Sequence, residues 1–286
     1  MDKVWRIIDL LNWGTEYFGG KGIEQPRLNI EFLLTHVLHK TRMNLYVSYE
    51  EIVEEKDLKV LKEFIHRRVN NEPLMYILGE TEFYDCKIKV DKRVLIPRPE
   101  TESMVDEAVS AIKKFSLNKI ADLGTGSGCI AIALAHKFKE LAIDAVDNSS
   151  DAIALARENA LLNGVSERIN FIKEYMHTFL DNNKGFDLII SNPPYISLPE
   201  YENLSMSVKK FEPMAALTDG DDGKKIISGI IQRLPNVLAE KGIAFIEFGY
   251  LMGDWILQYT KDCGLTGKIF EDIHKLPRFI RVKKNN

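Results

Sequence analysis

The sequence predicts an α/β protein, in which a small N-terminal helical bundle precedes a doubly wound and mostly parallel sheet of seven strands. Apolar residues recur with helical periodicity through the first 75 of the 286 residues, and strand-like and helix-like segments alternate from residue 118 onward. Such alternation is typical of a parallel sheet that helices cover on both faces. We therefore expect a bundle over residues 1–75, a β-hairpin linker over 76–100 and the sheet domain over 101–286.

The composition indicates a soluble globular protein. Hydrophobic residues make up 45% of the chain and charged residues 28%, which is enough for a substantial core. The formal net charge of -4 argues against a dedicated nucleic-acid-binding protein. The three cysteines form no CxxC pair, so their spacing predicts neither a zinc site nor a disulfide framework. No signal-peptide pattern opens the chain and no apolar run approaches the ~18 residues of a membrane span, so we expect a cytoplasmic location.

The N-terminal bundle is expected to contain three short amphipathic helices. The second should begin at about Pro26, since proline is favoured in the first turn of a helix. The apolar positions are Val4, Ile7, Ile8 and Leu11 in the first helix and Leu58, Leu61 and Ile65 in the third. Periodicity reports only packing, so a substrate-docking role for the bundle competes with that of a passive brace.

A β-hairpin is predicted between the two domains. Apolar residues and lysines alternate over 87–90, a polar turn follows at Asp91 and Lys92, and the returning strand covers 93–96. Two prolines then stiffen the linker, and the acidic run after them suits a helix that begins at about Thr101.

The sheet domain should supply its strands in chain order. The expected strands are 118–123, 141–147, 169–174, 186–191, 243–249, 265–274 and 278–284. The expected helices are 127–138, 149–163, 222–242 and 251–264. Ser149 is a suitable N-cap with Gly164 just past the end of that helix, and Pro235 predicts a kink or break. The last two strands form a hairpin whose basic tail we expect at an exposed edge.

A glycine-rich turn, DLGTGSG, follows the first strand. Gly124, Gly126 and Gly128 allow tight turns and the close approach of a ligand, and the following helix offers free N–H groups. The spacing is GxGxG rather than GxGxxG, which disfavours a nicotinamide-dependent dehydrogenase. The alternative interpretation is an ordinary strand-to-helix loop.

Acidic residues end the second and third strands. Asp147 lies about 20 residues past the glycines, where α/β nucleotide sites place a carboxylate that accepts both ribose hydroxyls. The alternative is an acid that interacts only with the dipole of the next helix. Glu174 and Tyr175 would reach an adenine by hydrogen bond and ring contact, although a lone tyrosine is more often a packing residue.

The fourth strand stops at Asn192-Pro193-Pro194-Tyr195, because two consecutive prolines cannot continue a strand ladder. Ligands of open α/β sheets bind at the carboxyl ends of the strands where the strand order reverses, and the first and fourth strands are neighbours there. We therefore expect this NPPY loop to face the glycine-rich turn. Taken alone, the alternative is a rigid turn without chemistry.

Together, the glycine-rich turn, Asp147 and the NPPY loop resemble those of class I S-adenosylmethionine-dependent methyltransferases that act on planar nitrogens. The segments RRVNNEPLMYILGETEFYDCKIKVDKRVLIPRPETE, residues 67–102, and FEPMAALTDGDDG, residues 211–223, closely resemble the HemK/PrmC family. The resemblance covers nearly the whole chain. That family methylates the glutamine of the GGQ motif in peptide chain release factors, so the resemblance implies a Rossmann-like fold and protein-glutamine N-methyltransferase activity.

The resemblance also implies two sets of site residues. The expected cofactor contacts are Gly124, Thr125, Gly126, Ser127, Gly128, Asp147, Tyr175 and Asn192, to which the strand argument adds Glu174. The expected contacts of the substrate glutamine are Asn192, Pro193, Pro194 and Tyr195, with Asn192 and Pro193 catalytic. Three positions depart from the common family pattern: Glu174 stands where many members have Asp, Tyr175 where some have Trp, and Phe211 where Tyr is common.

The expected chemistry follows from the weak nucleophilicity of an amide nitrogen. The Asn192 side-chain oxygen and the Pro193 carbonyl would each accept one N–H of the substrate amide and turn its lone pair toward the methyl donor. Tyr195 would pack against the glutamine. The sulfonium of S-adenosylmethionine already activates the methyl group, so no metal is expected and the product is S-adenosylhomocysteine. The six scattered histidines show no pattern that would identify a general base.

We expect a monomer that binds the GGQ loop of release factors and neither DNA nor membranes. Two alternatives stay open. A DNA adenine amino-methyltransferase also carries an NPPY loop, but it needs a recognition domain and a basic groove, which a net charge of -4 does not indicate. A non-catalytic S-adenosylmethionine-binding adaptor of translation factors would not need both Asn192 and the glycine-rich turn.

Overall fold

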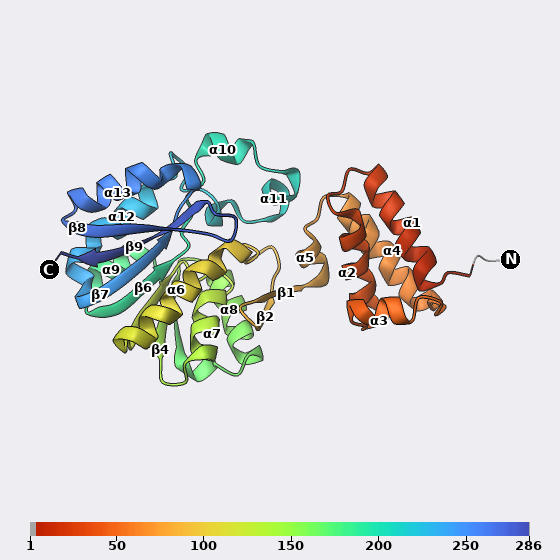
Figure 1. The fold of residues 1–286 in the computed structure, drawn as a ribbon, viewed down its shortest axis with the longest axis horizontal. Helices are drawn as coiled ribbons and strands as arrows, with labels where there is room; N and C mark the ends of the chain where they lie inside the picture. Colours follow the sequence, from red (N-terminus) through yellow and green to blue (C-terminus); the bar gives the residue numbers. More distant parts are fainter. Residues whose placement is uncertain (1–3, 286) are drawn as a thin grey trace. The chain divides into compact units, whose positions relative to one another are not determined.

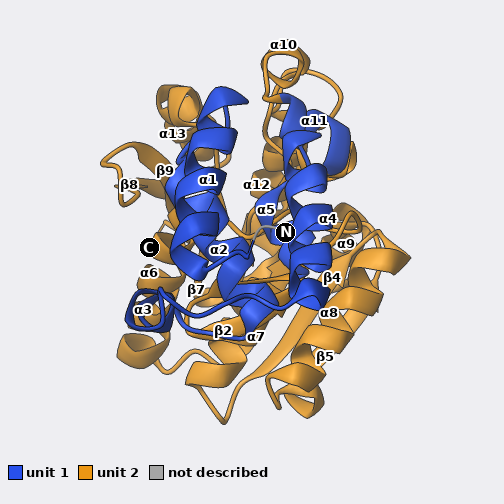
Figure 2. Ribbon diagram, turned by 90° about the vertical axis from the view of Figure 1, so that its right-hand side faces the viewer, with its two compact units in different colours: residues 1–79, 206–211 blue, residues 80–205, 212–286 orange. Residues whose placement is uncertain are grey.

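The computed structural model describes residues 4–285, which divide into two compact units, drawn in blue and orange in Figure 2. The first unit contains the chain up to Gly79 together with the segment 206–211, and the second contains 80–205 and the chain from 212 onward. Each unit has a buried hydrophobic cluster of its own, as expected of parts that fold around separate cores.

The first unit is helical. Its helices are α1 (Ile7–Gly20), α2 (Pro26–Leu38), α3 (Arg42–Val47), α4 (Glu55–Val69), α5 (Leu74–Leu78) and, from later in the chain, α11 (Met206–Phe211). The three predicted helices are α1, α2 and α4, and Pro26 begins α2 as predicted. Val4 precedes α1 and is exposed, so its prediction as part of the apolar face was wrong. The short helices α3 and α5 were missed because fewer than two turns show no clear periodicity.

A two-stranded hairpin opens the second unit, but it lies earlier in the chain than predicted. Strand β1 (Glu80–Phe83) pairs with β2 (Cys86–Lys89), and the turn between them is Tyr84-Asp85. Both turn residues have positive φ, 50° and 63°, which suits the right-handed twist of a tight hairpin. At the predicted turn the Val94 N–H donates to the Asp91 carbonyl, but no strand follows it.

The main sheet has the order β5-β4-β3-β6-β7-β9-β8 (Figure 1). Its strands are β3 (Lys119–Leu123), β4 (Ala142–Asp147), β5 (Ile169–Lys173), β6 (Phe186–Ser191), β7 (Leu238–Glu247), β8 (Leu265–Glu271) and β9 (Pro277–Lys284). The first five in chain order run parallel, and β9 is antiparallel to both of its neighbours. The predicted mostly parallel seven-stranded sheet is therefore confirmed, with β3 and β6 adjacent as expected.

The basic tail was predicted to belong to a hairpin at the exposed edge of the sheet, and β8 and β9 do form a hairpin at that edge. Strand β9, which carries the tail, lies between β7 and β8, so β8 forms the edge. Phe279, Ile280 and Val282 of β9 are buried, and this apolar set favours an interior position over an edge.

Helices cover both faces of the sheet (Figure 1). Helices α6 (Pro99–Phe115), α7 (Cys129–Lys137) and α8 (Ser150–Leu162) pack side by side on one face. Helices α9 (Met176–Asn182), α12 (Lys225–Val237) and α13 (Gly253–Asp262) share the hydrophobic cluster of the other. Ser149 caps α8 by accepting the Ala152 N–H, as predicted. Helix α12 continues through Pro235 to Val237, so the predicted break is absent.

The connection between β6 and α12 is longer and more structured than predicted. It contains α10 (Leu198–Glu202), α11 and the short 3-10 helix η2 (Met214–Ala216). Two further 3-10 turns, η1 (Ser166–Arg168) and η3 (Tyr250–Met252), lie elsewhere in the second unit. The NPPY loop begins this connection, directly after β6.

Candidate active site

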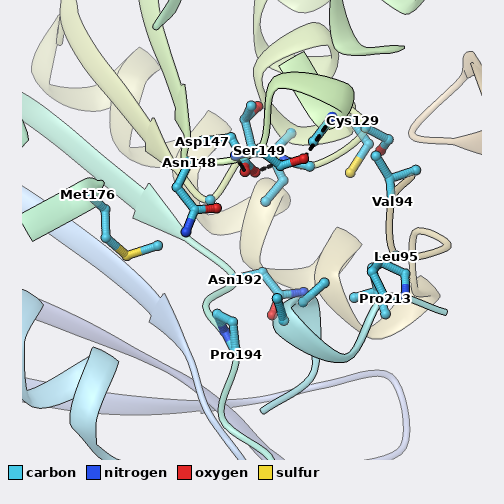
Figure 3. A pocket seen from close by; sticks show the side chains of 18 of the residues that line it. Val94, Leu95, Cys129, Asp147, Asn148, Ser149, Met176, Asn192, Pro194 and Pro213 are labelled. Atoms are coloured by element: carbon cyan, nitrogen blue, oxygen red, sulfur yellow. Dashed lines mark hydrogen bonds between the residues drawn. The ribbon is translucent and has the colours of Figure 1, made fainter. Parts of the chain in front are cut away.

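A cavity of about 330 Å³ lies in the second unit at the carboxyl ends of β3, β4, β5 and β6. Its walls come from the glycine-rich turn, the segment after β5, the NPPY loop, the segment 93–98 and the region around η2. Figure 3 shows Asp147, Ser149 and Asn148 on one wall, with Asn192 and Pro194 across from them. The two motifs that the strand order was expected to bring together therefore face one cavity.

The glycine-rich turn has the backbone geometry that its sequence predicted. Gly124, Gly126 and Gly128 have φ values of 72°, 54° and 82°, a region that L-residues with a Cβ rarely adopt. A Cβ on Gly128 would also lie 3.1 Å from the Ala156 Cβ, so this position lets α7 approach α8. Backbone N–H groups of Gly124 and Thr125 both donate to the Val146 carbonyl, which ties the turn to β4.

Asp147 ends β4 and lines the cavity. Its Oδ2 accepts the Gly126 N–H at 2.9 Å, and its Oδ1 accepts the Ser149 N–H at 2.9 Å. Burial raises the pKa of this carboxyl, and the backbone N–H groups of Ser149, Gly126 and Asn148 oppose that rise. The side chain thus joins the glycine-rich turn to the start of α8, and its remaining lone pairs can accept further hydrogen bonds.

Asp122 lies beneath the same turn and received no role from the sequence. Its Oδ2 accepts the Thr125 hydroxyl at 2.7 Å and the Ala131 N–H at 3.2 Å, while its buried Oδ1 has no partner among the described residues. Burial raises the pKa of Asp122 to about 7, and the nearby Asp147 adds to the rise. Burial and the neighbouring carboxyl both disfavour the ionised form of Asp122.

The segment after β5 borders the cavity. Glu174, Tyr175, Met176 and His177 all line it, and the Glu174 N–H donates to the Asp147 carbonyl at 3.0 Å. The Tyr175 side chain is 69% exposed, so its ring lies at the rim and not in a packed core. This exposure argues against the alternative that Tyr175 is an ordinary packing residue.

The NPPY loop divides between the cavity and the interior. Asn192 and Pro194 line the cavity, whereas Pro193 and Tyr195 are not among its lining residues. Within residues 4–285, no group donates a hydrogen bond to the Pro193 carbonyl. The Tyr195 hydroxyl donates to Glu247 at 2.9 Å. Of the other predicted site residues, Gly124, Thr125, Gly126 and Ser127 line the cavity and Gly128 does not.

Sequence reasoning missed three residues that hold the NPPY loop. The Asn192 side-chain amide donates a hydrogen bond to the Thr101 hydroxyl at 3.2 Å. Glu247 accepts the hydrogen bond from the Tyr195 hydroxyl. Gly223 packs on the loop so closely that a Cβ there would lie 2.2 Å from the Tyr195 carbonyl oxygen. Two signals in the sequence could have found them. Glu247 interrupts the apolar run of β7, and Thr101 and Gly223 lie in the two segments that resemble the HemK/PrmC family, 67–102 and 211–223.

An ion pair joins those two segments. Arg98 Nη2 lies 2.7 Å from Glu212 Oε1, and the Ile96 N–H donates to Glu212 Oε2 at 3.2 Å. Glu212 is buried and the Arg98 side chain is 35% exposed, so this charge-assisted contact is partly shielded from solvent. It holds the segment 93–98 beside Pro213, and both line the cavity.

Within the described part of the chain, no group of three or more His, Cys, Asp or Glu side chains is arranged to hold a metal ion. Among residues 4–285, no helix is both long and apolar enough to cross a membrane.

Two family models match the chain. One, described as the PrmC N-terminal domain, matches residues 9–79, and the other, described as the methyltransferase small domain, matches residues 104–208.

Solved structures support the fold. The hMettl16 catalytic domain in complex with an RNA hairpin superposes with a TM-score of 0.57 at 15% identity, over 82% of this chain and 84% of that one. The ribosomal protein L11 methylase of Lactobacillus delbrueckii subsp. bulgaricus has a TM-score of 0.50 at 22% identity, over 70% and 86%.

Curated relatives share one name. The release factor glutamine methyltransferase of Rhodopirellula baltica is 38% identical over 250 residues, which are 86% of this chain and 84% of the relative. That of Chlorobaculum tepidum is 39% identical over 254 residues, 86% of each chain. That of Nitratidesulfovibrio vulgaris is 38% identical over 266 residues, 92% of this chain and 90% of the relative. The chain belongs to the release factor glutamine methyltransferase family.

Proposed function

We propose that this enzyme transfers a methyl group from S-adenosylmethionine to the side-chain amide nitrogen of the GGQ glutamine in peptide chain release factors. The observation that carries the proposal is one cavity that joins a nucleotide-type wall, the glycine-rich turn with Asp147, to the amide of Asn192. The relatives' shared name supports the choice of substrate.

The cavity residues fit S-adenosylmethionine. Asp147 can accept ribose hydroxyls, the turn from Gly124 to Ser127 borders the same space, and Glu174 and Tyr175 can offer an acceptor and an exposed ring to adenine. When bound, this cofactor supplies a methyl group made electrophilic by a sulfonium.

The NPPY loop is suited to a substrate amide. The lone pair of an amide nitrogen is delocalised into its carbonyl, so the site must orient the NH₂ group. Asn192 Oδ1 can accept one N–H and the Pro193 carbonyl, which accepts no other hydrogen bond among residues 4–285, can accept the second. Positioning of this kind and fixed dipoles can lower a barrier by several kcal/mol. The Tyr195 ring supports the loop from inside, through Glu247.

We also propose that the helical unit docks the release factor, that the enzyme acts as a monomer in the cytoplasm, and that it needs neither a metal nor DNA. The support is the separate PrmC N-terminal domain match, which covers a unit with its own core. A net charge of -4 gives no basic surface excess for nucleic acid.

One assay tests the function. The enzyme is incubated with methyl-labelled S-adenosylmethionine and a release factor, a release factor whose GGQ glutamine is replaced by Ala, or duplex DNA, and products are mapped by mass spectrometry. We expect one methyl group on the glutamine of the first protein alone. Methylated DNA would support the adenine alternative, and cofactor binding without any transfer would support the adaptor alternative.

A further inference from the structure

Glu247 is a buried carboxylate, 1% exposed, whose two oxygens both accept hydroxyl protons. Thr101, in the first turn of α6, donates to Oε2 at 2.7 Å, and Tyr195 donates to Oε1 at 2.9 Å. The two donors lie 146 and 52 residues away in sequence. Thr101 is also buried and Tyr195 is half-buried, so this arrangement is a built network and not a surface accident.

The network has a fixed polarity. An ionised carboxylate can only accept hydrogen bonds, and a threonine hydroxyl has one proton to donate. Because Glu247 takes that proton, the Thr101 oxygen can only accept from its other neighbour, Asn192. It accepts the Asn192 Nδ2–H at 3.2 Å, which leaves Oδ1 as the end of the Asn192 amide that is free for a ligand.

We propose that Glu247 and Thr101 are positioning residues that fix the orientation of the Asn192 amide, so that its oxygen and not its NH₂ group meets the substrate amide. This inference rests on the proposed function. If the network were reversed, Thr101 would donate to Asn192 Oδ1, and the Asn192 NH₂ group would meet the NH₂ group of the substrate. Two donors cannot bond, so the substrate nitrogen would lose one of its two acceptors.

Protonation of Glu247 removes the polarity, because a neutral carboxyl can donate as well as accept. Burial raises the pKa of Glu247 to about 7, against the hydrogen bonds from Thr101 and Tyr195. The charged or titratable groups around it are Arg278 on β9, which lowers the pKa, and Glu100 on α6, which raises it. The charge of Glu247 in turn raises the pKa of the Cys129 thiol on α7. The Asn192 amide is therefore expected to keep one fixed orientation above the pKa of Glu247 and to lose it below this pKa.

The orientation can be measured without substrate. In enzyme labelled with ¹⁵N-asparagine, the Asn192 side-chain NH₂ signal is identified by its absence in Asn192→Ala. At pH 8 we expect one Nδ2 proton of Asn192 to exchange slowly with solvent. This protection should disappear as the pH is lowered through 7, and it should be absent at any pH in Thr101→Val. An unprotected NH₂ group in the wild-type enzyme would overturn the proposal. Since no methyl transfer is involved, this result is independent of whether the proposed function is right.

Kinetics separate positioning from simple support of the fold. Thr101→Val keeps the shape but removes the hydroxyl, and we expect kcat on the release factor to fall about 10- to 100-fold. Thr101→Ser should restore kcat to within about threefold, because it returns the hydroxyl. Thr260→Val is the matched control, since it removes another buried hydroxyl, one that donates to the Ile256 carbonyl within α13. It should leave kcat unchanged, and a Thr101→Val enzyme with wild-type kcat would overturn the proposal.

The pH profile tests Glu247 directly. Wild-type kcat should rise with pH through an apparent pKa near 7. In Glu247→Gln, which keeps the size but cannot ionise, we expect a lower kcat and no such rise. Calorimetry with S-adenosylhomocysteine should show cofactor affinity within about threefold of wild type, which separates this loss from a collapsed fold. An acid limb that persists with the same midpoint in Glu247→Gln would overturn the proposal.

Discussion

Asp147 binds two backbone groups of its own chain, yet it lines the cavity, so two roles have to be separated. If it binds the cofactor ribose, Asp147→Ala removes charge-assisted hydrogen bonds of ~1.5–3 kcal/mol, and S-adenosylmethionine affinity should fall about 10- to 100-fold by calorimetry. Asp151→Ala is the control for the alternative that Asp147 interacts only with the dipole of α8. Asp151 is an exposed acid in the first turn of that helix. Its substitution should change affinity less than about twofold. Equal effects of the two variants would contradict the ribose assignment.

Asp122 makes the stability of the second unit depend on pH. Its pKa is raised to about 7 in the folded chain, against ~3.9 when unfolded, so the folded state binds the extra proton between these values. Its contribution is fully present below pH ~4 and is lost as pH rises from there through 7, a fall on the order of 4 kcal/mol. Asp122→Asn, which cannot ionise, should flatten this slope.

The measurement needs a probe of that unit alone. Trp5, Trp13 and Trp255 are the three tryptophans, and only Trp255 lies in the second unit. In a background with Trp5→Phe and Trp13→Phe, urea unfolding followed by Trp255 fluorescence at pH 5 and pH 8 compares Asp122→Asn with its parent. The same loss of unfolding free energy in both proteins would contradict the assignment of the pH dependence to Asp122.

At the scale of elements, the NPPY loop is held by the segment that follows it. The Ile196 N–H donates to the Leu217 carbonyl, the Leu198 N–H donates to the Asp221 carbonyl, and Gly223 lies against the Tyr195 backbone. The segment 211–223 therefore acts as a clamp on the NPPY loop. Because the added atom would meet backbone and not a flexible side chain, the loop itself must move to accept any substitution of Gly223.

Gly223→Ala should consequently lower kcat by about tenfold or more, since displacement of a catalytic group by 1 Å can cost about 100-fold. Gly220→Ala is a close control: its φ of 82° matches the 78° of Gly223, but nothing lies within 4 Å of an added Cβ. Both variants carry the same backbone strain, so the difference between them isolates the clash. Initial rates of release-factor methylation measure it, and equal rates for the two variants would contradict the clamp.

The elements that sequence predicted well are those with a repeating pattern. Strands β3 to β6 and helices α7 and α8 lie close to their predicted ranges, because burial on both faces gives long apolar runs. Strand β7 begins five residues earlier than predicted, within the range predicted as helix. The hairpin turn was predicted at the wrong position because its two residues of positive φ are Tyr84 and Asp85, and neither is the glycine or asparagine that usually marks such a turn. Helices α10 and α11 are only five and six residues long, too short to show a period.

The candidate site was predictable to the same degree. Gly124, Asp147 and Asn192 each follow a recognisable strand, and strand order brings them to one cavity. Thr101 and Glu247 could not be found this way. Their contact joins residues 146 apart, and the packing of α6 on β7 brings them together. Buried polar partners depend on three-dimensional packing, which periodicity does not report.

At the scale of the molecule, the proposed division of labour assigns substrate docking to one of two units with separate cores and chemistry to the other. The first unit depends on a close crossing of α1 and α2 at Gly14, where an added Cβ would lie 2.4 Å from the Ile30 Cγ1. Cavity residues all belong to the second unit. Damage to the first unit should therefore affect the protein substrate and spare the cofactor.

Gly14→Ala tests this division. Overpacking at the crossing should destabilise the helical unit by ~1–3 kcal/mol and raise KM for the release factor, while calorimetry shows unchanged affinity for S-adenosylhomocysteine. Gly19→Ala lies on the same helix with nothing within 4 Å of the added Cβ, so it should leave KM unchanged and stabilise α1 by up to ~1 kcal/mol. If Gly14→Ala lowers the melting temperature of the helical unit without changing KM, the unit is only a brace. A rise in KM confined to Gly14→Ala assigns recognition of the release factor to the helices and methyl transfer to the sheet.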